Sequence, residues 1–123
     1  MAHILIIDDS PTDVKVLTGT LEKAGHKVTA VASAEEGIAA AKNVHPDLVL
    51  MDVIMPGMNG FQATRTLSRD PQTSSIPVVI VTTKTMETDR MWGLRQGARD
   101  FLTKPVSDKD LLAHVNKLLP SAA

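Results

Sequence analysis

The feature that most constrains how this chain can fold is an unbroken apolar run, Leu48 to Met51, that ends directly in a carboxylate, Asp52. A short apolar run without alternation is typical of a β-strand buried on both faces, as the strands of parallel sheets are. Pro56 and Gly57 follow within a few residues and favour a loop after the strand. We therefore expect Asp52 to lie at the carboxyl edge of a sheet, where open α/β sheets bind their ligands.

Similar apolar runs alternate along the chain with amphipathic segments that begin at helix-capping residues. The expected strands cover residues 3–8, 27–31, 47–52, 76–82 and 100–103. The expected helices cover about residues 11–24, 34–45, 61–70, 86–96 and 108–119. Strict alternation requires a parallel sheet, because each parallel return needs a right-handed crossover that carries a helix over one face. The predicted fold is an α/β, doubly wound, flavodoxin-like three-layer sandwich with strand order 2-1-3-4-5.

The fourth helix has the weakest pattern. Met91 and Leu94 align with Ala98 as a core-facing line, whereas Trp92 lies about 100° away from that line. We expect Met91, like Phe61, to be a core residue, and Trp92 to be partly buried, either as flank packing or as an anchor for a partner. The four histidines share no metal-ligand spacing, so we expect solvated rings at positions 3, 26, 45 and 114.

The composition limits the class of protein. A chain of 123 residues with 43% hydrophobic composition suits one compact domain, so we expect a single domain over residues 1–123 without an output domain. The net charge of −1 provides no electrostatic footprint for nucleic acid or for an acidic membrane surface. The chain has no cysteine and no apolar stretch of membrane-spanning length, so we expect a cytoplasmic location.

Chemically active side chains gather at the carboxyl edge of the predicted sheet. The strand order places Asp8 and Asp9, which end the first strand, beside Asp52. The fourth and fifth strands bring Thr82 and Lys104 to the same edge. Converging carboxylates suit Mg²⁺, which takes oxygen ligands and keeps several waters, with Asp8 acting directly or through water. A carboxylate can also attack phosphorus and form an aspartyl phosphate, provided that the incoming negative charge is neutralised.

Motifs spread over the whole chain resemble the receiver domains of two-component response regulators. They are Asp8-Asp9, Asp52 with Met55-Pro56-Gly57 and Asn59-Gly60, Thr82, and Lys104-Pro105. The single-domain length resembles the stand-alone, chemotaxis-type receivers. Residues 60–65, 82–84 and 95–100 are more specifically similar to regulators of type IV pilus twitching motility.

The resemblance implies a role for each matched residue. Asp52 would be the phosphoacceptor, and Mg²⁺ would be bound by Asp9, Asp52 and the backbone carbonyl of Ile54, with Asp8 as an outer ligand. Thr82 and Lys104 would contact the phosphoryl group. The remaining roles are a switch pair formed by Thr82 and Phe101 and a cis peptide bond before Pro105. Thr83 competes with Thr82 as the hydroxyl donor, but Thr82 directly ends the apolar run.

The implied activity is a phosphorylation-controlled switch rather than an enzyme acting on a separate substrate. A histidine kinase or its phosphotransfer domain would supply the phosphoryl group. A downstream protein would bind a surface on the fourth helix, fifth strand and fifth helix, formed by Lys84, Arg90, Leu94, Thr103 and the flank of Trp92. We expect a monomer that contacts neither nucleic acid nor membrane.

Several other functions compete with this interpretation. The switch could instead act as a phosphate sink for a partner regulator. An aspartyl-phosphate phosphohydrolase would want a second acid two residues beyond the nucleophile, where this chain has Ile54. A flavodoxin-like cofactor carrier would need hydroxyls and amides in its first loop, where Asp8 and Asp9 would repel a phosphate. An adaptor that kept only the fold would not need the acidic set.

Overall fold

The computed structural model describes residues 2–84 and 86–119, which form five parallel strands and five helices. The strands are β1 (His3–Ile7), β2 (Lys27–Val31), β3 (Leu48–Met51), β4 (Val78–Thr82) and β5 (Asp100–Thr103). The helices are α1 (Pro11–Lys23), α2 (Ala34–Val44), α3 (Gly60–Arg69), α4 (Glu87–Arg95) and α5 (Asp108–Leu118). The sheet order is β2-β1-β3-β4-β5, so the predicted fold and strand order are confirmed.

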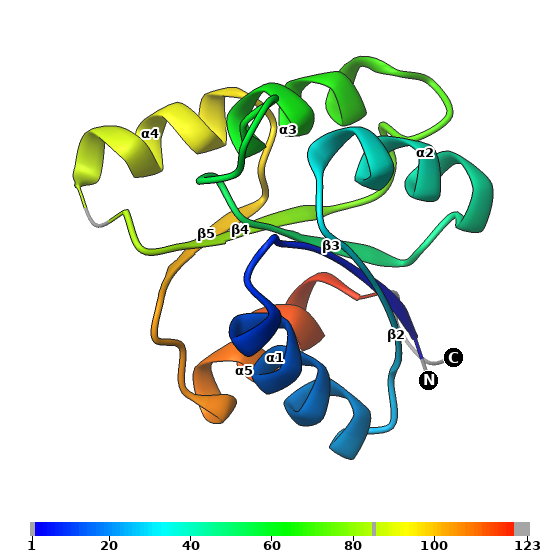
Figure 1. Ribbon diagram of the computed structural model, residues 1–123, viewed down its shortest axis with the longest axis vertical. Helices are drawn as coiled ribbons and strands as arrows, with labels where there is room; N and C mark the ends of the chain where they lie inside the picture. Colours follow the sequence, from blue (N-terminus) through cyan, green and yellow to red (C-terminus); the bar gives the residue numbers. More distant parts are fainter. Residues whose placement is uncertain (1, 85, 120–123) are drawn as a thin grey trace.

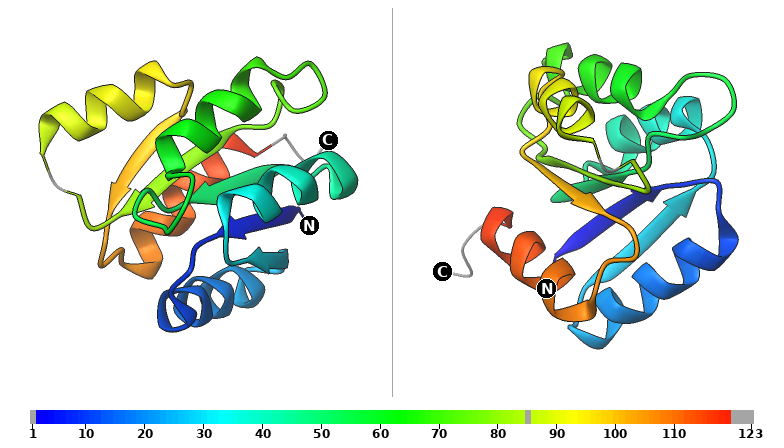
Figure 2. Two further views of the ribbon diagram at one scale, coloured as in Figure 1. Left: turned by 45° about the horizontal axis from the view of Figure 1, so that its top comes forward. Right: turned by 90° about the vertical axis from the view of Figure 1, so that its left-hand side faces the viewer.

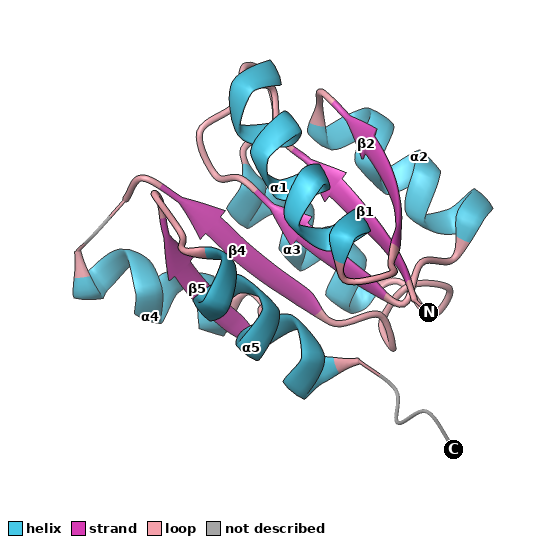
Figure 3. Cartoon of the chain, turned by 90° about the horizontal axis from the view of Figure 1, so that it is seen from below, coloured by secondary structure: helices cyan, strands magenta, loops and turns pink. Residues whose placement is uncertain are grey.

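The helices cover the sheet in two layers. Figure 1 shows α2, α3 and α4 on one side of the sheet and α1 and α5 on the other. Seen from below, α1 and α5 lie in front of the strands (Figure 3). No helix in the described part of the chain is both long enough and apolar enough to cross a membrane.

Each face of the sheet has its own apolar core, which explains why the strands lack alternation. In β1, Ile4 and Ile6 pack towards α1 and α5, while Leu5 and Ile7 pack towards α2 and α3. All four side chains are buried. Burying one such side chain contributes about 1.5–3 kcal/mol, so a strand covered on both faces must be apolar throughout.

Four of the five helices begin at a side-chain cap. The hydroxyls of Ser10, Ser33 and Ser107 each accept a hydrogen bond from the backbone amide three residues later. Asn59 does the same for α3 and forms a reciprocal capping box with Gln62. Helix α4 begins at Met86, which offers no side-chain hydrogen bond. Its start is therefore the least firmly fixed of the five.

The packing of α4 differs from the prediction made from its sequence. Met91 is 52% exposed and Leu94 is 38% exposed, so the expectation of a core-facing Met91 is wrong. Gly93 is buried instead, and a Cβ placed there would lie 2.7 Å from Ile80 Cδ1 and 3.3 Å from Phe101 Cδ2. The helix backbone approaches the sheet at this glycine, which turns the larger apolar side chains outward.

None of the four histidines is buried, as expected for surface residues, but each has one ring nitrogen within hydrogen-bonding distance of a neighbour. His3 Nε2 lies 2.7 Å from Thr29 Oγ1, and His45 Nε2 lies 2.9 Å from the Gln72 carbonyl oxygen. His26 Nδ1 accepts a hydrogen bond from the Ala2 amide, and His114 Nδ1 pairs with the Asp100 carboxylate. These contacts link strand ends and loops while the rings stay at the surface.

Candidate functional site

The in-register pairing of β1 with β3 brings the acidic residues together. Ile7 pairs with Met51, and the Asp52 amide donates to the Ile7 carbonyl at 2.9 Å. Asp8 and Asp52 therefore leave the sheet side by side. Carboxylate oxygens of Asp8, Asp9 and Asp52 all lie within 4.8 Å of one another. Asp8 and Asp52 are buried, whereas Asp9 is exposed.

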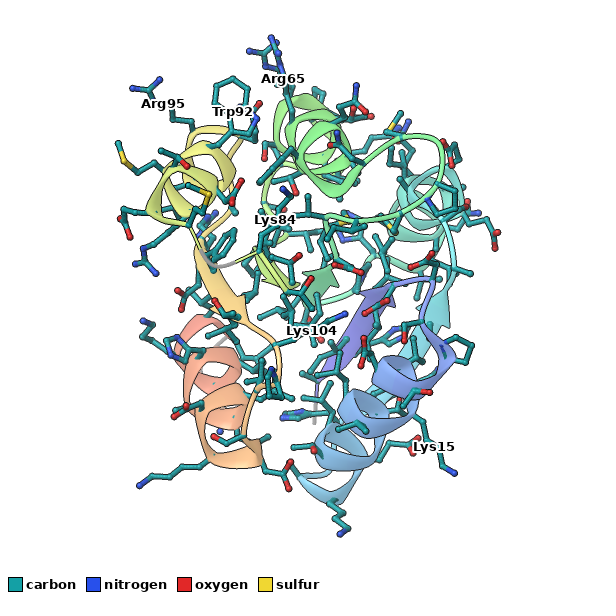
Figure 4. All side chains as sticks on the ribbon, turned by 60° about the vertical axis from the view of Figure 1, so that its left-hand side comes forward. Lys15, Arg65, Lys84, Trp92, Arg95 and Lys104 are labelled. Carbon is teal, nitrogen blue, oxygen red and sulfur yellow. The ribbon has the colours of Figure 1, made fainter. Side chains whose placement is uncertain are left out.

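Lys104 reaches this cluster from the end of β5. Its Nζ lies 2.7 Å from Asp8 Oδ2, 2.9 Å from Asp13 Oδ2 and 3.5 Å from Asp52 Oδ2, and its side chain is only 11% exposed. The peptide bond between Lys104 and Pro105 is cis. In Figure 4, Lys104 lies near the centre of the molecule. The ammonium therefore bridges three carboxylates at the edge of the sheet.

Asp13 is the site residue that was missed in the sequence. It lies in the first turn of α1, where an acidic residue is already explained by the helix dipole. Its pairing with Lys104 joins residues 91 positions apart. No local pattern predicts such a contact, so only the tertiary structure reveals it.

The balance between burial and the neighbouring charges raises the pKa values of Asp52 and Lys104 and lowers that of Asp13. Burial raises the pKa of Asp52, and the charge of Asp8 adds to this effect, although attraction to Lys104 opposes both. Burial also acts against the charged form of Lys104, but hydrogen bonds to Asp8 and Asp13 outweigh it and raise the pKa of the ammonium. The hydrogen bond from Lys104 lowers the pKa of Asp13. One ammonium therefore faces an excess of carboxylate charge.

The donor set fits a hard divalent cation. Mg²⁺ prefers carboxylate oxygens and retains several waters, which suits a site with one exposed and two buried aspartates. Within the described residues, Asp8, Asp9 and Asp52 are the one group of three acidic or histidine side chains that could hold a metal ion. The Ile54 amide lies 3.4 Å from Asp52 Oδ1, which places residue 54 beside the same carboxylate.

Gly60 fixes the loop that follows Asp52. A Cβ at this position would lie 2.1 Å from the Asp52 carbonyl oxygen and 2.8 Å from Val53 Cα. The Gly60 amide donates to the Val53 carbonyl at 3.1 Å. The first turn of α3 therefore rests directly on the backbone that carries Asp52, which gives the Asn59-Gly60 motif a structural reason.

Thr82 and Phe101 lie beneath the same edge. Thr82 is fully buried and its Oγ1 lies 3.4 Å from the Lys84 amide, whereas Thr83 is exposed. This difference favours Thr82 as the hydroxyl facing the site. The Phe101 ring is only 6% exposed and packs with Ile80, so the structure holds it in an inward position.

Comparisons with known proteins agree with this geometry. A family model described as the response regulator receiver domain matches residues 4–116. The chain is 58% identical over 119 residues to Protein PilH of Pseudomonas aeruginosa, which covers 97% of this chain and 98% of PilH. It is 42% identical over 117 residues to Response regulator PleD of Caulobacter vibrioides, covering 95% of this chain but only 26% of PleD.

Solved structures give the same result. The chemotaxis protein CheY4 of Vibrio cholerae has a TM-score of 0.90 and 31% sequence identity, covering 97% of this chain and 99% of that chain. The receiver domain of sensor histidine kinase PA1611 from Pseudomonas aeruginosa has a TM-score of 0.89 and 28% identity, covering 98% of both chains. A magnesium ion is coordinated in the active-site cleft of that receiver. This chain therefore belongs to the response regulator receiver domain family.

Proposed function

We propose that this receiver is a stand-alone phosphorylation switch in which Asp52 accepts a phosphoryl group from a histidine kinase or its phosphotransfer domain. The observation that carries the proposal is the convergence of Asp8, Asp9 and Asp52 around the Lys104 ammonium. An Asp52 oxygen attacks the phosphorus, the bond from phosphorus to the histidine nitrogen breaks, and that nitrogen leaves with the electron pair.

The neighbouring residues make this attack electrostatically possible. Asp8, Asp9, Asp52 and the Ile54 carbonyl would hold Mg²⁺, which when bound would supply positive charge against the incoming phosphoryl oxygens. Lys104 lies 3.5 Å from Asp52 and can pair with a phosphoryl oxygen as a point charge. Thr82 can donate its hydroxyl to another. Ile54 is 54% exposed and carries no acid, which disfavours a phosphohydrolase.

A groove next to the site suits the phosphodonor protein. It has a volume of about 140 Å³ and is lined by Asp13, Val16, Leu17, Lys104, Pro105 and Val106. Val16 is 57% exposed on α1, so it offers an apolar contact within reach of the site. A partner that seats an apolar side chain in this groove would bring its histidine towards Asp52 while leaving α4 free.

The output would be a protein contact that phosphorylation makes or breaks. Arg90 and Leu94 are exposed on α4, and Gly93 of α4 packs on Phe101. Movement of Thr82 towards the phosphoryl group would change the space around Phe101 and shift α4. The similarity to PilH supports a role in twitching motility. We further propose that residues 1–123 form one domain that acts as a cytoplasmic monomer.

The test is phosphorylation by acetyl phosphate with and without Mg²⁺, followed by peptide mass spectrometry. We expect label on Asp52 only when Mg²⁺ is present, because the acidic cluster otherwise repels the donor. Asp52→Asn should remain unlabelled, and Glu22→Gln, which removes an exposed acid from α1, should be labelled as the wild type is. Label on another residue, or label in Asp52→Asn, would refute the assignment.

A further inference from the structure

The outer surface of α3 and α4 carries aromatic, thioether and guanidinium groups that the phosphorylation site does not use. We call it the α3–α4 face and define it by Arg65 of α3 and by Met91, Trp92 and Arg95 of α4. Trp92 is 51% exposed and Met91 is 52% exposed. Together with Thr88, the three α4 residues line a hollow of about 170 Å³. Two large apolar side chains are thus more than half exposed next to each other on one helix.

The two helices lie next to each other, so these side chains form one surface. Figure 2 shows α3 and α4 side by side in both views. Phe61 Cε1 lies 3.3 Å from where a Cβ on Gly93 would stand, and Ser68 packs against Gly97 beyond the end of α4. Arg65 lies between Phe61 and Ser68 on the same side of α3. Figure 4 shows Arg65 beside Trp92 and Arg95, with all three pointing away from the sheet.

This surface is separate from the one expected to carry the output. On α4, Trp92 and Leu94 lie about 100° to either side of the buried Gly93. Figure 4 shows Trp92 on the side of α4 next to α3. Helical geometry places Arg90, like Leu94, on the other side of Gly93. The helix therefore presents two different faces, and the expectation that the flank of Trp92 belongs to the output surface stays a prediction.

The arginines of the α3–α4 face have no acidic partner in the described structure. None of the ion pairs among residues 2–84 and 86–119 includes Arg65 or Arg95. Arg69, one helical turn beyond Arg65, is also exposed and adds like charge that would repel it. The whole chain has a net charge of −1, so this local cluster of positive charge is opposite in sign to the net charge of the protein.

We propose that the α3–α4 face docks an acidic amphipathic helix of a partner protein. Apolar side chains of that helix would cover Met91 and Trp92, and its carboxylates would pair with Arg65 and Arg95. Trp, Met and Arg are the residues enriched at the centres of protein interfaces, and Trp and Arg dominate their binding energy. The surface includes neither the acidic cluster nor Thr82, so the docking proposal does not rest on the proposed phosphorylation.

The test uses a fluorescein-labelled helical peptide of about 18 residues with leucines on one face and glutamates on the other. Fluorescence anisotropy at low salt should show saturable binding. Trp92→Ala and the double variant Arg65→Glu/Arg95→Glu should each weaken binding by about tenfold or more. The charge-matched control is Lys27→Glu/Arg99→Glu, which reverses two exposed basic residues outside both the α3–α4 face and the output surface and should bind the peptide as the wild type does.

The other outcomes decide against the proposal. Equal losses in the two double variants would show only non-specific attraction between charges. Absence of saturable binding, or tighter binding to anionic vesicles or to duplex DNA than to the peptide, would also overturn it. Acetyl phosphate should still label Arg65→Glu/Arg95→Glu on Asp52, so a failure of docking is distinguishable from a failure of the phosphorylation site.

Discussion

Replacing Asp52 with asparagine should stabilise the domain at pH 7 when no divalent cation is present. The substitution keeps the shape of the side chain and removes one of three converging carboxylate charges. The raised pKa of Asp52 also indicates that its charge destabilises the folded state, because burial and the charge of Asp8 disfavour the ionised form. The cost is absent at a pH below the unfolded pKa, where the group is protonated in both states. It grows as pH rises from the unfolded to the folded pKa and is complete above the folded pKa.

The distances give the size of the effect. Asp8 and Asp9 lie within 4.8 Å of Asp52, which at an effective dielectric of about 20 corresponds to repulsions of about 3.5 kcal/mol each. Attraction to Lys104 at 3.5 Å returns about 4.7 kcal/mol on the same scale. The relief is about 2 kcal/mol, and the exposure of Asp9 reduces it to about 1–2 kcal/mol. For a chain of 123 residues this raises the melting temperature by about 4–8 °C.

Thermal unfolding followed by circular dichroism in EDTA measures this difference. The gain in Asp52→Asn should shrink as pH falls towards 3, where the wild-type carboxylate is also neutral, and it should shrink when Mg²⁺ is added, since the ion stabilises only the wild-type site fully. Glu22→Gln removes an exposed charge from α1 and should change the melting temperature little. A melting temperature of Asp52→Asn equal to or below that of the wild type in EDTA would refute the electrostatic argument.

Two more substitutions test the supports of the site. Gly60→Ala should lower the free energy of unfolding by about 2–3 kcal/mol, because its Cβ would lie 2.1 Å from the Asp52 carbonyl oxygen. Urea denaturation would show this loss as a lower midpoint. Gly19→Ala in α1 has open space around it and should be neutral or stabilising; equal losses would contradict the packing argument. The pKa of Asp100 is lowered because its bonds to His114 and to the Phe101 amide outweigh burial. Asp100→Asn should therefore lower the free energy of unfolding at pH 7 but not at a pH below the folded pKa of Asp100. If urea denaturation shows the same decrease in stability at acidic pH for the variant and the wild type, the pairing does not contribute as argued.

The arrangement of the sheet could be predicted because local and global signals agree. Each strand is an apolar run, and four helices begin at Ser or Asn caps. Alternation then leaves a parallel order in which β1 and β3 are neighbours. Because both strands pair in register up to Ile7 and Met51, the adjacency of Asp8 and Asp52 follows directly.

Other contacts could not be predicted because they depend on distant residues or on backbone proximity. An acidic residue in the first turn of a helix is explained locally, so the pairing of Asp13 with Lys104 was missed. The pattern of α4 was misinterpreted for a related reason. Periodicity arguments count large apolar side chains, but Gly93 is the residue that faces the sheet, because only a glycine lets the helix come this close to Ile80.

The weak attachment of α4 suits its place in the proposed switch. Gly93 is its one buried residue, and its first turn has no side-chain cap. An element held by so few buried contacts opens or shifts at a lower free energy than the capped helices around it. At Gly93 the helix packs against Ile80, Phe101 and Phe61. Phe101 pairs with Ile80 in the sheet, two residues before Thr82 on β4. A change at Thr82 can therefore reach α4 through one aromatic ring, and both exposed faces of the helix would move with it.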